Sequence, residues 1–193
     1  IKIGSILFNS LGRRSFDLVA NKGFNIFFDI KFHDIPNTVA HSILSFKGYP
    51  INLLTVHISG GMSMLTRARE AAHAIKSKVI GVSLLTSLDQ KDVEKVFFND
   101  IRKVADNLFD LAKEANMDGI VCSAHELKYA RTNIPNLLKI VPGIRLSSDN
   151  DDQKRVMSPG EALKLGANHL VIGRPITESK HPNAELEKIY ETL

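Results

Sequence analysis

The stretch DIKFHDIPNT, residues 29–38, places two carboxylates and a lysine within six positions, at the end of an apolar run that begins at Phe24. Side chains of the same parity lie on one face of a strand, so Asp29 and Lys31 are expected to point the same way. Because apolar neighbours exclude water, these charges need each other or a substrate as a partner. The segment alone leaves two interpretations open, a structural ion pair that ends a core strand and a catalytic pair.

Short apolar runs alternate with longer segments of helical periodicity along the whole chain. Strands are expected at residues 1–4, 24–30, 53–57, 79–85, 119–123, 138–142 and 169–173, and helices at 63–75, 101–115 and after the N-cap Ser158. The alternation indicates a parallel sheet whose apolar strands are buried on both faces. An open doubly wound sheet is the alternative, but no GxGxxG or P-loop follows any of these strands. We therefore predict a (β/α)8 TIM barrel of the α/β class, with its first strand missing before Ile1, that forms a single domain over residues 1–193.

Composition and charge restrict the classes of protein to which the chain can belong. Its 193 residues are 44% hydrophobic, which suffices for one substantial core. The net charge of +4 comes from scattered lysines and arginines without an aromatic–basic motif, so we expect no nucleic-acid partner. Cys122 is the single cysteine, which excludes a disulfide framework and fits a reducing compartment. No apolar stretch approaches the length of a membrane span, so we expect a soluble cytoplasmic protein without a membrane partner.

Polar residues gather at the carboxyl ends of the expected strands, where barrel enzymes carry their active sites. The last two strands end in PGIR (142–145) and VIGRPIT (171–177), and loops at these places often bind phosphate. Each arginine alone is better interpreted as a surface or salt-bridge residue, but their shared placement at these strand ends reverses that preference and favours an anion site. Between them, residues 146–159 are polar and aperiodic, either a surface loop or a lid in which Gln153 contacts the ligand. The strand-end residues are Lys2, Asp29, Lys31, His57, Thr86, Ser123, Arg145, Gly173 and Arg174.

Seven sequence segments together resemble one known family. In order and spacing, DIKFHDIPNT, TVHISGG, VSLLTSL, IVCSAHE, VPGIR, DQKRVMSP and LVIGRPIT are similar to the bacterial-type orotidine 5′-phosphate decarboxylases, over essentially the whole chain. The resemblance implies a (β/α)8-barrel homodimer without metal or organic cofactor. It further implies conversion of orotidine 5′-monophosphate to uridine 5′-monophosphate, the last step of pyrimidine nucleotide synthesis.

The resemblance assigns chemistry to the charged residues. It implies an alternating array of Lys2, Asp29, Lys31 and, from the neighbouring subunit, Asp34. Lys31 is expected to be the general acid that protonates the carbon from which the carboxylate leaves. Asp29 is expected to lie near that carboxylate and to hold Lys31, while Lys2 contacts the ribose and orients Asp29.

The resemblance also implies how the substrate and the second subunit are held. Ile35 and Thr38 are expected to reach the neighbouring subunit's site, with Thr38 near the ribose. Thr86 is expected to bind the pyrimidine, and Gln153 to reach both base and phosphate. The residues expected to hold the phosphate are Arg145, Gly173 and Arg174. The aspartate with which the family binds the ribose hydroxyls, at the end of its first strand, has no counterpart in this sequence.

The implied chemistry suits these residue types. Loss of CO2 from C6 of the pyrimidine leaves a carbanion in the ring plane, where π-delocalisation cannot stabilise it. A fixed ammonium stabilises this carbanionic transition state more than the ground state, and a neighbouring carboxylate keeps the ammonium charged. We expect no metal, because Asp29, Asp34 and His57 lack the spacing of a ligand set and Lys31 beside them would repel a cation.

Other interpretations remain open from sequence. His57 is either a site-facing residue or a structural histidine, and Cys122 is expected to be a buried structural thiol. A sugar-phosphate decarboxylase or aldolase of the same wider family shares the DxKxxD pattern but uses a divalent metal, so metal dependence would distinguish it. A non-catalytic module that binds phosphate or RNA is the more distant alternative, and steep salt dependence of RNA binding would support it.

Overall fold

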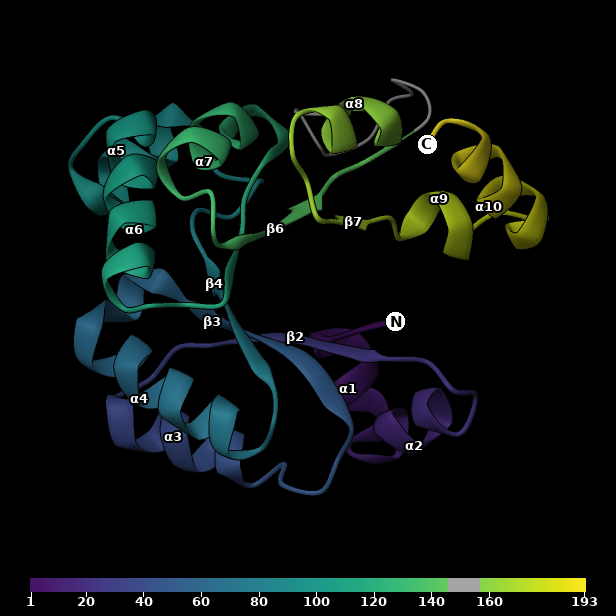
Figure 1. The fold of residues 1–193 in the computed structure, drawn as a ribbon, viewed down its shortest axis with the longest axis horizontal. Helices are drawn as coiled ribbons and strands as arrows, with labels where there is room; N and C mark the ends of the chain where they lie inside the picture. The colour runs from purple at the N-terminus through teal and green to yellow at the C-terminus, as the bar shows by residue number, and fades with distance from the viewer. Residues whose placement is uncertain (146–156) are drawn as a thin grey trace. The chain divides into compact units, whose positions relative to one another are not determined.

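The structure is a computed structural model that describes residues 1–145 and 157–193 (Figure 1). It divides into two compact units. Unit 1 contains residues 1–83 and 110–120, and unit 2 contains residues 84–109 and 121–193. Gln153 and most of the predicted lid lie outside the described residues. The prediction of a single domain stays a prediction.

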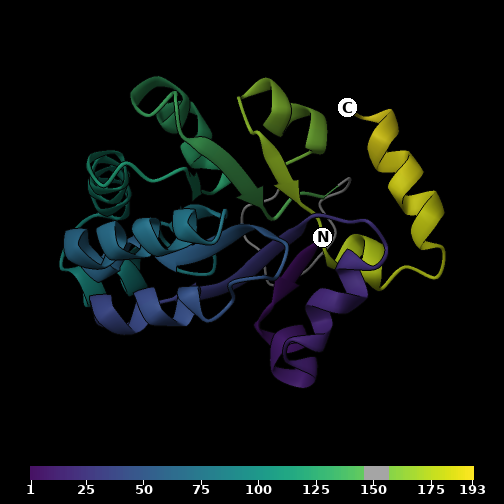
Figure 2. The same cartoon turned by 60° about the horizontal axis from the view of Figure 1, so that its bottom comes forward.

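Unit 1 contains parallel strands that alternate with helices. Strand β1 pairs with β2, β2 with β3, and β3 with β4, all in parallel. Helices α3 and α4 lie side by side along these strands, as Figures 1 and 2 both show. The elements are β1 (Lys2–Gly4), α1 (Ser5–Leu11), α2 (Arg14–Ala20), β2 (Ile26–Phe32), α3 (Pro36–Leu44), β3 (Ile51–His57), η1 (Ile58–Gly60), α4 (Gly61–Ala74) and β4 (Lys78–Val82).

Unit 2 continues the same alternation, and α6 and β5 each contain residues of both units. Strands β6 and β7 pair in parallel and lie side by side in Figure 2. The elements are α5 (Gln90–Phe97), α6 (Ile101–Glu114), β5 (Gly119–Val121), η2 (Ala124–Glu126), α7 (Leu127–Asn133), β6 (Leu138–Pro142), α8 (Pro159–Lys164), β7 (His169–Val171), α9 (Arg174–Thr177) and α10 (Pro182–Glu191).

The strand order is that of a (β/α) barrel. Within the described residues, seven strands follow one another in the sheet in chain order, and at least one helix follows each of them. A complete barrel has eight such units. The predicted α/β barrel is therefore confirmed, and each predicted strand corresponds to an observed one with shifts of a few residues at its ends.

The core of unit 1 is built around β2 and the two helices that follow β1. Phe16 and Phe28 are fully buried, and their rings meet edge to face with centroids 5.0 Å apart. Phe8 and Phe46 complete the cluster, with centroids 4.8 and 5.0 Å from that of Phe28. Such aromatic pairs contribute about 0.5–1.5 kcal/mol each beyond the burial of their area. The cluster therefore anchors β2, the strand that also carries Asp29 and Lys31.

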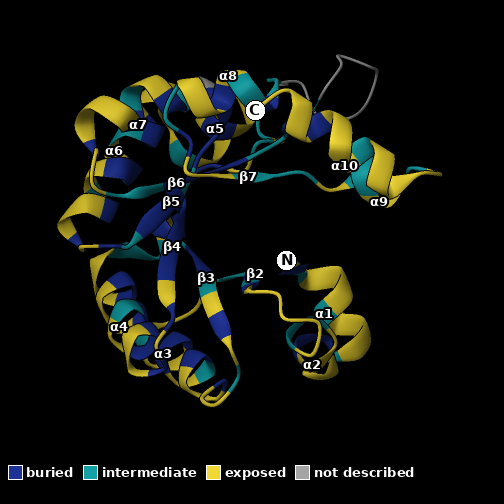
Figure 3. Cartoon of the chain, turned by 45° about the vertical axis from the view of Figure 1, so that its right-hand side comes forward, coloured by how far each residue is buried: buried dark blue, intermediate teal, exposed yellow. Residues whose placement is uncertain are grey.

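Helices α3 and α4 each bury one face, and Figure 3 shows dark blue and yellow segments alternating along them. In α4 the buried residues recur at the three- and four-residue spacing predicted from sequence. The start of α8 is also as predicted, because Ser158 caps it and forms a reciprocal capping box with Glu161. The buried residues of α4 are Met64, Leu65, Ala68, Ala71 and Ala72.

The residue that caps the C-terminus of helix α5 has an unfavourable backbone conformation. Phe98, its C-terminal cap, has φ 54° and ψ 32°, the left-handed conformation that glycine adopts most readily. Its N–H still donates to the Glu94 carbonyl at 3.0 Å, so the turn is closed at the expense of steric strain. The side chain is 89% exposed and gains little from packing.

We predict that Phe98→Gly stabilises the protein by about 1 kcal/mol, because it relieves the left-handed strain without removing a buried contact. Thermal unfolding would show this as a higher Tm. The matched control is Val96→Gly, which changes an exposed residue within the same helix and should lower stability by about 1 kcal/mol. Equal destabilisation by both glycines would contradict the prediction.

Candidate active site

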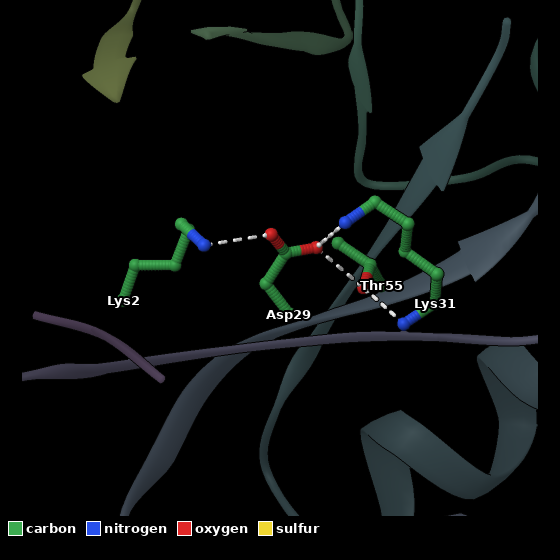
Figure 4. Close-up of polar contacts among 4 residues, drawn as sticks. All are labelled: Lys2, Asp29, Lys31 and Thr55. Atoms are coloured by element: carbon green, nitrogen blue, oxygen red, sulfur yellow. Dashed lines mark hydrogen bonds and ion pairs between the residues drawn. The ribbon is translucent and has the colours of Figure 1, made fainter. Parts of the chain in front are cut away.

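Three charged side chains of unit 1, carried by β1 and β2, meet in one group (Figure 4). The predicted position of Lys2 at the end of its strand is wrong, because Lys2 is the first residue of β1, and its side chain reaches Asp29 in the middle of β2. The Asp29 carboxylate is the centre of the group. Its Oδ1 lies 2.9 Å from Lys31 Nζ, and its Oδ2 lies 3.1 Å from Lys2 Nζ. Each carboxylate oxygen thus has its own ammonium partner, which fixes the plane of the carboxylate as well as its charge. This brings together three of the four residues predicted for the charged array.

The pairing of β1 with β2 places Lys2 in this group. In the parallel register Lys2 lies opposite Phe27, and Gly4 lies opposite Asp29. A Cβ atom on Gly4 would stand 3.1 Å from Lys2 Nζ. The absence of a side chain at Gly4 therefore leaves the room that the Lys2 ammonium occupies beside Asp29.

Strand β2 is irregular at Lys31. Phe28 pairs with Leu54 and Phe32 with Val56, so four steps along β2 correspond to two along β3. Within this bulge Lys31 has φ 55°, in the left-handed region. The prediction that Asp29 and Lys31 lie together is confirmed by their 2.9 Å contact. The regular alternation on which it rested does not hold at Lys31, because the bulge redirects the backbone.

The electrostatics of Asp29 follow from burial and its two cations. The residue is 8% exposed, and burial by itself disfavours the charged carboxylate. The ammonium groups of Lys31 and Lys2 outweigh this effect and hold the pKa of Asp29 below its ordinary value. Asp29 is therefore ionised at neutral pH.

His57 ends β3 beside this group. Its ring centroid lies 5.2 Å from that of His33, and its side chain is half-buried. Burial, then the neighbouring His33 and Lys31, lower the pKa of His57, while Asp29 partly opposes them. His57 is thus a neutral imidazole at neutral pH.

The residues predicted to reach a neighbouring subunit lie on the surface at the start of α3. Asp34, Ile35 and Thr38 are all exposed, and 67% of Ile35 is accessible to solvent. Asp34 Oδ1 accepts the Ile35 N–H at 2.6 Å, which orders the turn before the helix. Their expected role in a homodimer stays a prediction.

The remaining predicted ligands belong to unit 2. Thr86 is half-buried in the turn after β4, and Gly173 is the exposed N-cap of α9, which begins with Arg174. A Cβ atom on Gly173 would meet nothing within 4 Å. The Arg145 N–H donates to the Met157 carbonyl at 3.2 Å, so backbone on both sides of residues 146–156 is tied together. The expected binding of phosphate and base by these residues stays a prediction.

Other features of the described residues bear on the alternatives. Cys122 is buried, and burial raises the pKa of its thiol, as expected of a structural cysteine.

Within residues 1–145 and 157–193, no group of three or more His, Cys, Asp or Glu side chains is placed to hold a metal ion. No helix in those same ranges is long and apolar enough to cross a membrane.

Sequence reasoning missed Thr55. Its hydroxyl, fully buried on β3, lies 3.1 Å from Asp29 Oδ1 and 2.9 Å from the Lys31 backbone nitrogen (Figure 4). The available signal was a polar side chain inside the otherwise apolar run 53–56. Threonine is common in strands, so this signal was weak.

The lowered pKa of Asp29 predicts how stability depends on pH. A carboxylate with a lower pKa in the folded than in the unfolded protein contributes stability above its unfolded value of 3.8, and this is lost as pH falls through the folded pKa. Asp29→Asn should therefore show a smaller loss of Tm between about pH 5 and about pH 3 than the wild type. Glu187→Gln, the corresponding change at an exposed position of α10, should keep the wild-type pH dependence. Identical slopes for Asp29→Asn and the wild type would contradict the assignment.

Comparisons with known proteins agree with this geometry. A model of the orotidine 5′-phosphate decarboxylase / HUMPS family matches residues 1–189. The orotidine 5′-phosphate decarboxylase of Ehrlichia chaffeensis is 42% identical over 193 residues, which cover 98% of this chain and 83% of the relative. That of Saccharophagus degradans is 41% identical over 194 residues, 98% of this chain and 82% of the relative. The crystal structure of orotidine 5′-phosphate decarboxylase from Lactobacillus acidophilus superposes with a TM-score of 0.85 at 31% identity, over 99% of this chain and 85% of that one. The chain belongs to the orotidine 5′-phosphate decarboxylase / HUMPS family.

Proposed function

We propose that this protein is a carboxy-lyase that converts orotidine 5′-monophosphate to uridine 5′-monophosphate in pyrimidine synthesis, without metal or organic cofactor. The observation that carries the proposal is the array of Lys2, Asp29 and Lys31 on β1 and β2. Membership of the family and the names of the relatives at 41–42% identity support the choice of substrate. A cytoplasmic location belongs to the same proposal.

Lys31 is the proposed general acid. Its ammonium, held by Asp29, stabilises negative charge that develops at C6 as CO2 leaves. The same ammonium then transfers a proton to C6, so that the C–C bond electrons end in a new C–H bond. Because the ammonium group is fixed before the reaction, it needs no reorganisation in the transition state.

Asp29 and Lys2 have supporting roles in this proposal. Asp29 keeps Lys31 charged and directed at C6, and Lys2 orients Asp29 while it contacts the ribose. Asp34 of a second subunit extends the array, with Ile35 and Thr38 from the same segment. The exposure of all three residues leaves them accessible to such a partner. The proposed assembly is a homodimer.

Binding of the remote parts of the substrate is assigned to unit 2. Arg145, Gly173 and Arg174 hold the phosphate, Thr86 contacts the pyrimidine, and Gln153 joins base and phosphate. The phosphate is distant from C6 in this substrate, so these residues take no part in bond breaking. They supply binding energy that orients the ring over the charged array.

The decisive test is decarboxylation in the presence of EDTA. The complete gene product should deplete the orotate ultraviolet absorbance of orotidine 5′-monophosphate at an undiminished rate after chelation. Lys31→Ala should lower kcat by about ten-thousandfold or more, because both charge stabilisation and proton transfer are lost. Turnover of a sugar phosphate only after magnesium is restored would instead assign the metal-dependent alternative.

We predict that one variant loses affinity for the product, whereas another loses catalysis but keeps that affinity. Arg145→Ala removes a charged donor to the phosphate and should weaken binding of uridine 5′-monophosphate roughly ten- to a hundredfold. Lys31→Ala should leave that product affinity within severalfold of wild type, measured by calorimetry. Arg102→Ala, which removes an exposed arginine from α6, controls for the change in net charge. Comparable losses of product affinity in the Arg145 and Lys31 variants would argue against this division.

A further inference from the structure

We propose that Thr55 is a positioning residue of the reaction, whose hydroxyl holds both the backbone of Lys31 and the carboxylate of Asp29. The inference rests on the proposed function for its catalytic consequence, but its structural part can be tested without turnover. Thr55 itself is fully buried, so it acts through its two neighbours rather than on the substrate.

The position of Thr55 is fixed by the regular part of the sheet. From Leu53 to His57, β3 pairs with β4 in an unbroken parallel register, in which Thr55 lies opposite Ile80. Leu54 and Val56 on either side of it are fully buried. The branched Cβ of threonine further restricts the rotation of its side chain. The Thr55 hydroxyl is therefore held by a regularly paired and buried segment of β3.

The two hydrogen bonds of this hydroxyl have only one possible direction. The Lys31 N–H can only donate, and it lies 2.9 Å from Oγ1. The ionised Asp29 carboxylate can only accept, and its Oδ1 lies 3.1 Å from the same oxygen. The hydroxyl consequently accepts from Lys31 and donates its single proton to Asp29. One side chain thus connects the backbone of the proposed acid to the carboxylate that orients its ammonium.

The hydrogen bond to Lys31 occurs where the strand ladder cannot supply one. The bulge between Phe28 and Phe32 takes the intervening part of β2 out of register with β3. Lys31 lies within it at φ 55°, a conformation that costs a lysine roughly 1–2 kcal/mol. A side chain from β3 replaces the missing ladder partner and stabilises the left-handed residue. Strained conformations persist at functional sites only when neighbours determine them in this way.

The hydrogen bond to Asp29 completes the set of donors around the carboxylate. Oδ1 accepts hydrogen bonds from the Thr55 hydroxyl and the Lys31 ammonium, and Oδ2 forms an ion pair with the Lys2 ammonium. Loss of the hydroxyl would leave the Lys31 ammonium as the single donor to Oδ1 among the described contacts. The carboxylate and ammonium would then lose the fixed geometry that electrostatic catalysis requires.

The test compares Thr55→Val with Thr55→Ser in the complete gene product. Valine keeps the shape and the branched Cβ but has no hydroxyl, whereas serine keeps the hydroxyl. We expect Thr55→Val to lower kcat roughly ten- to a hundredfold, the range typical of a displaced catalytic group, with product affinity within about twofold of wild type. Thr55→Ser should recover most of kcat.

A matched control separates positioning from general destabilisation. Ser77, which directly precedes β4, is also buried, and its hydroxyl donates at 2.6 Å to the carbonyl of Ile51, the first residue of β3. Ser77→Ala also removes a buried hydroxyl bound to β3, but one without a bond to Asp29 or Lys31, and should lower Tm without lowering kcat. An equal loss of kcat in Ser77→Ala and Thr55→Val, or no rescue by serine, would overturn the proposal.

Amide hydrogen exchange tests the geometry independently of any reaction. The Lys31 N–H should be protected in the wild type and in Thr55→Ser, and should exchange at least about tenfold faster in Thr55→Val. Unchanged exchange would overturn the role of Thr55 even in an active enzyme. If the wild type has no activity on orotidine 5′-monophosphate, the proposed function fails, while the exchange result still decides whether Thr55 holds Lys31.

Discussion

The buried carboxylate of Asp29 is the constraint on which the candidate site depends. A carboxylate that is 8% exposed loses most of its hydration, and it stays ionised because donors replace the water. Lys2, Lys31 and Thr55 supply those donors from β1, β2 and β3, so three strands must keep their relative positions for the charge to be tolerated. The arrangement carries one net positive charge, which suits an anionic substrate and a carbanionic transition state.

Strand β2 connects the hydrophobic core of unit 1 with this charge. Phe28 lies fully buried in the aromatic cluster, and the next residue, Asp29, belongs to the charged group. Adjacent strand residues point to opposite faces, so one peptide unit links core packing to the site. Packing of Phe8, Phe16 and Phe46 against Phe28 therefore limits the movement of Asp29. The register shift that contains Lys31 begins after the buried Phe28.

The sequence was sufficient for the features that depend on pattern. Alternating apolar runs predicted the strands and helices, and the DIK motif predicted that Asp29 and Lys31 meet. It was insufficient where a single backbone angle decides the geometry. Nothing in DIKFHD signals φ 55° at Lys31, because lysine has no preference for that region. Thr55 was missed for a related reason, since its function depends on a bulge in a different strand. Lys2 was noticed as a polar residue near a strand end, but only the resemblance linked it to Asp29, because their contact requires the β1–β2 register and the space at Gly4.

The composition of the charged group supports the proposed catalytic interpretation over a structural ion pair. A structural ion pair needs one cation for one carboxylate, and even that pair is often no more stable than apolar residues of similar volume. Here two ammonium groups lie within 3.1 Å of the same carboxylate, and 37% and 33% of the Lys2 and Lys31 side chains remain accessible. The second cation adds repulsion and ordering entropy without being needed for neutralisation. Lys31 adds backbone strain, which a structural ion pair does not require. Stability alone accounts for neither cost, whereas a reaction that needs a fixed and accessible ammonium accounts for both.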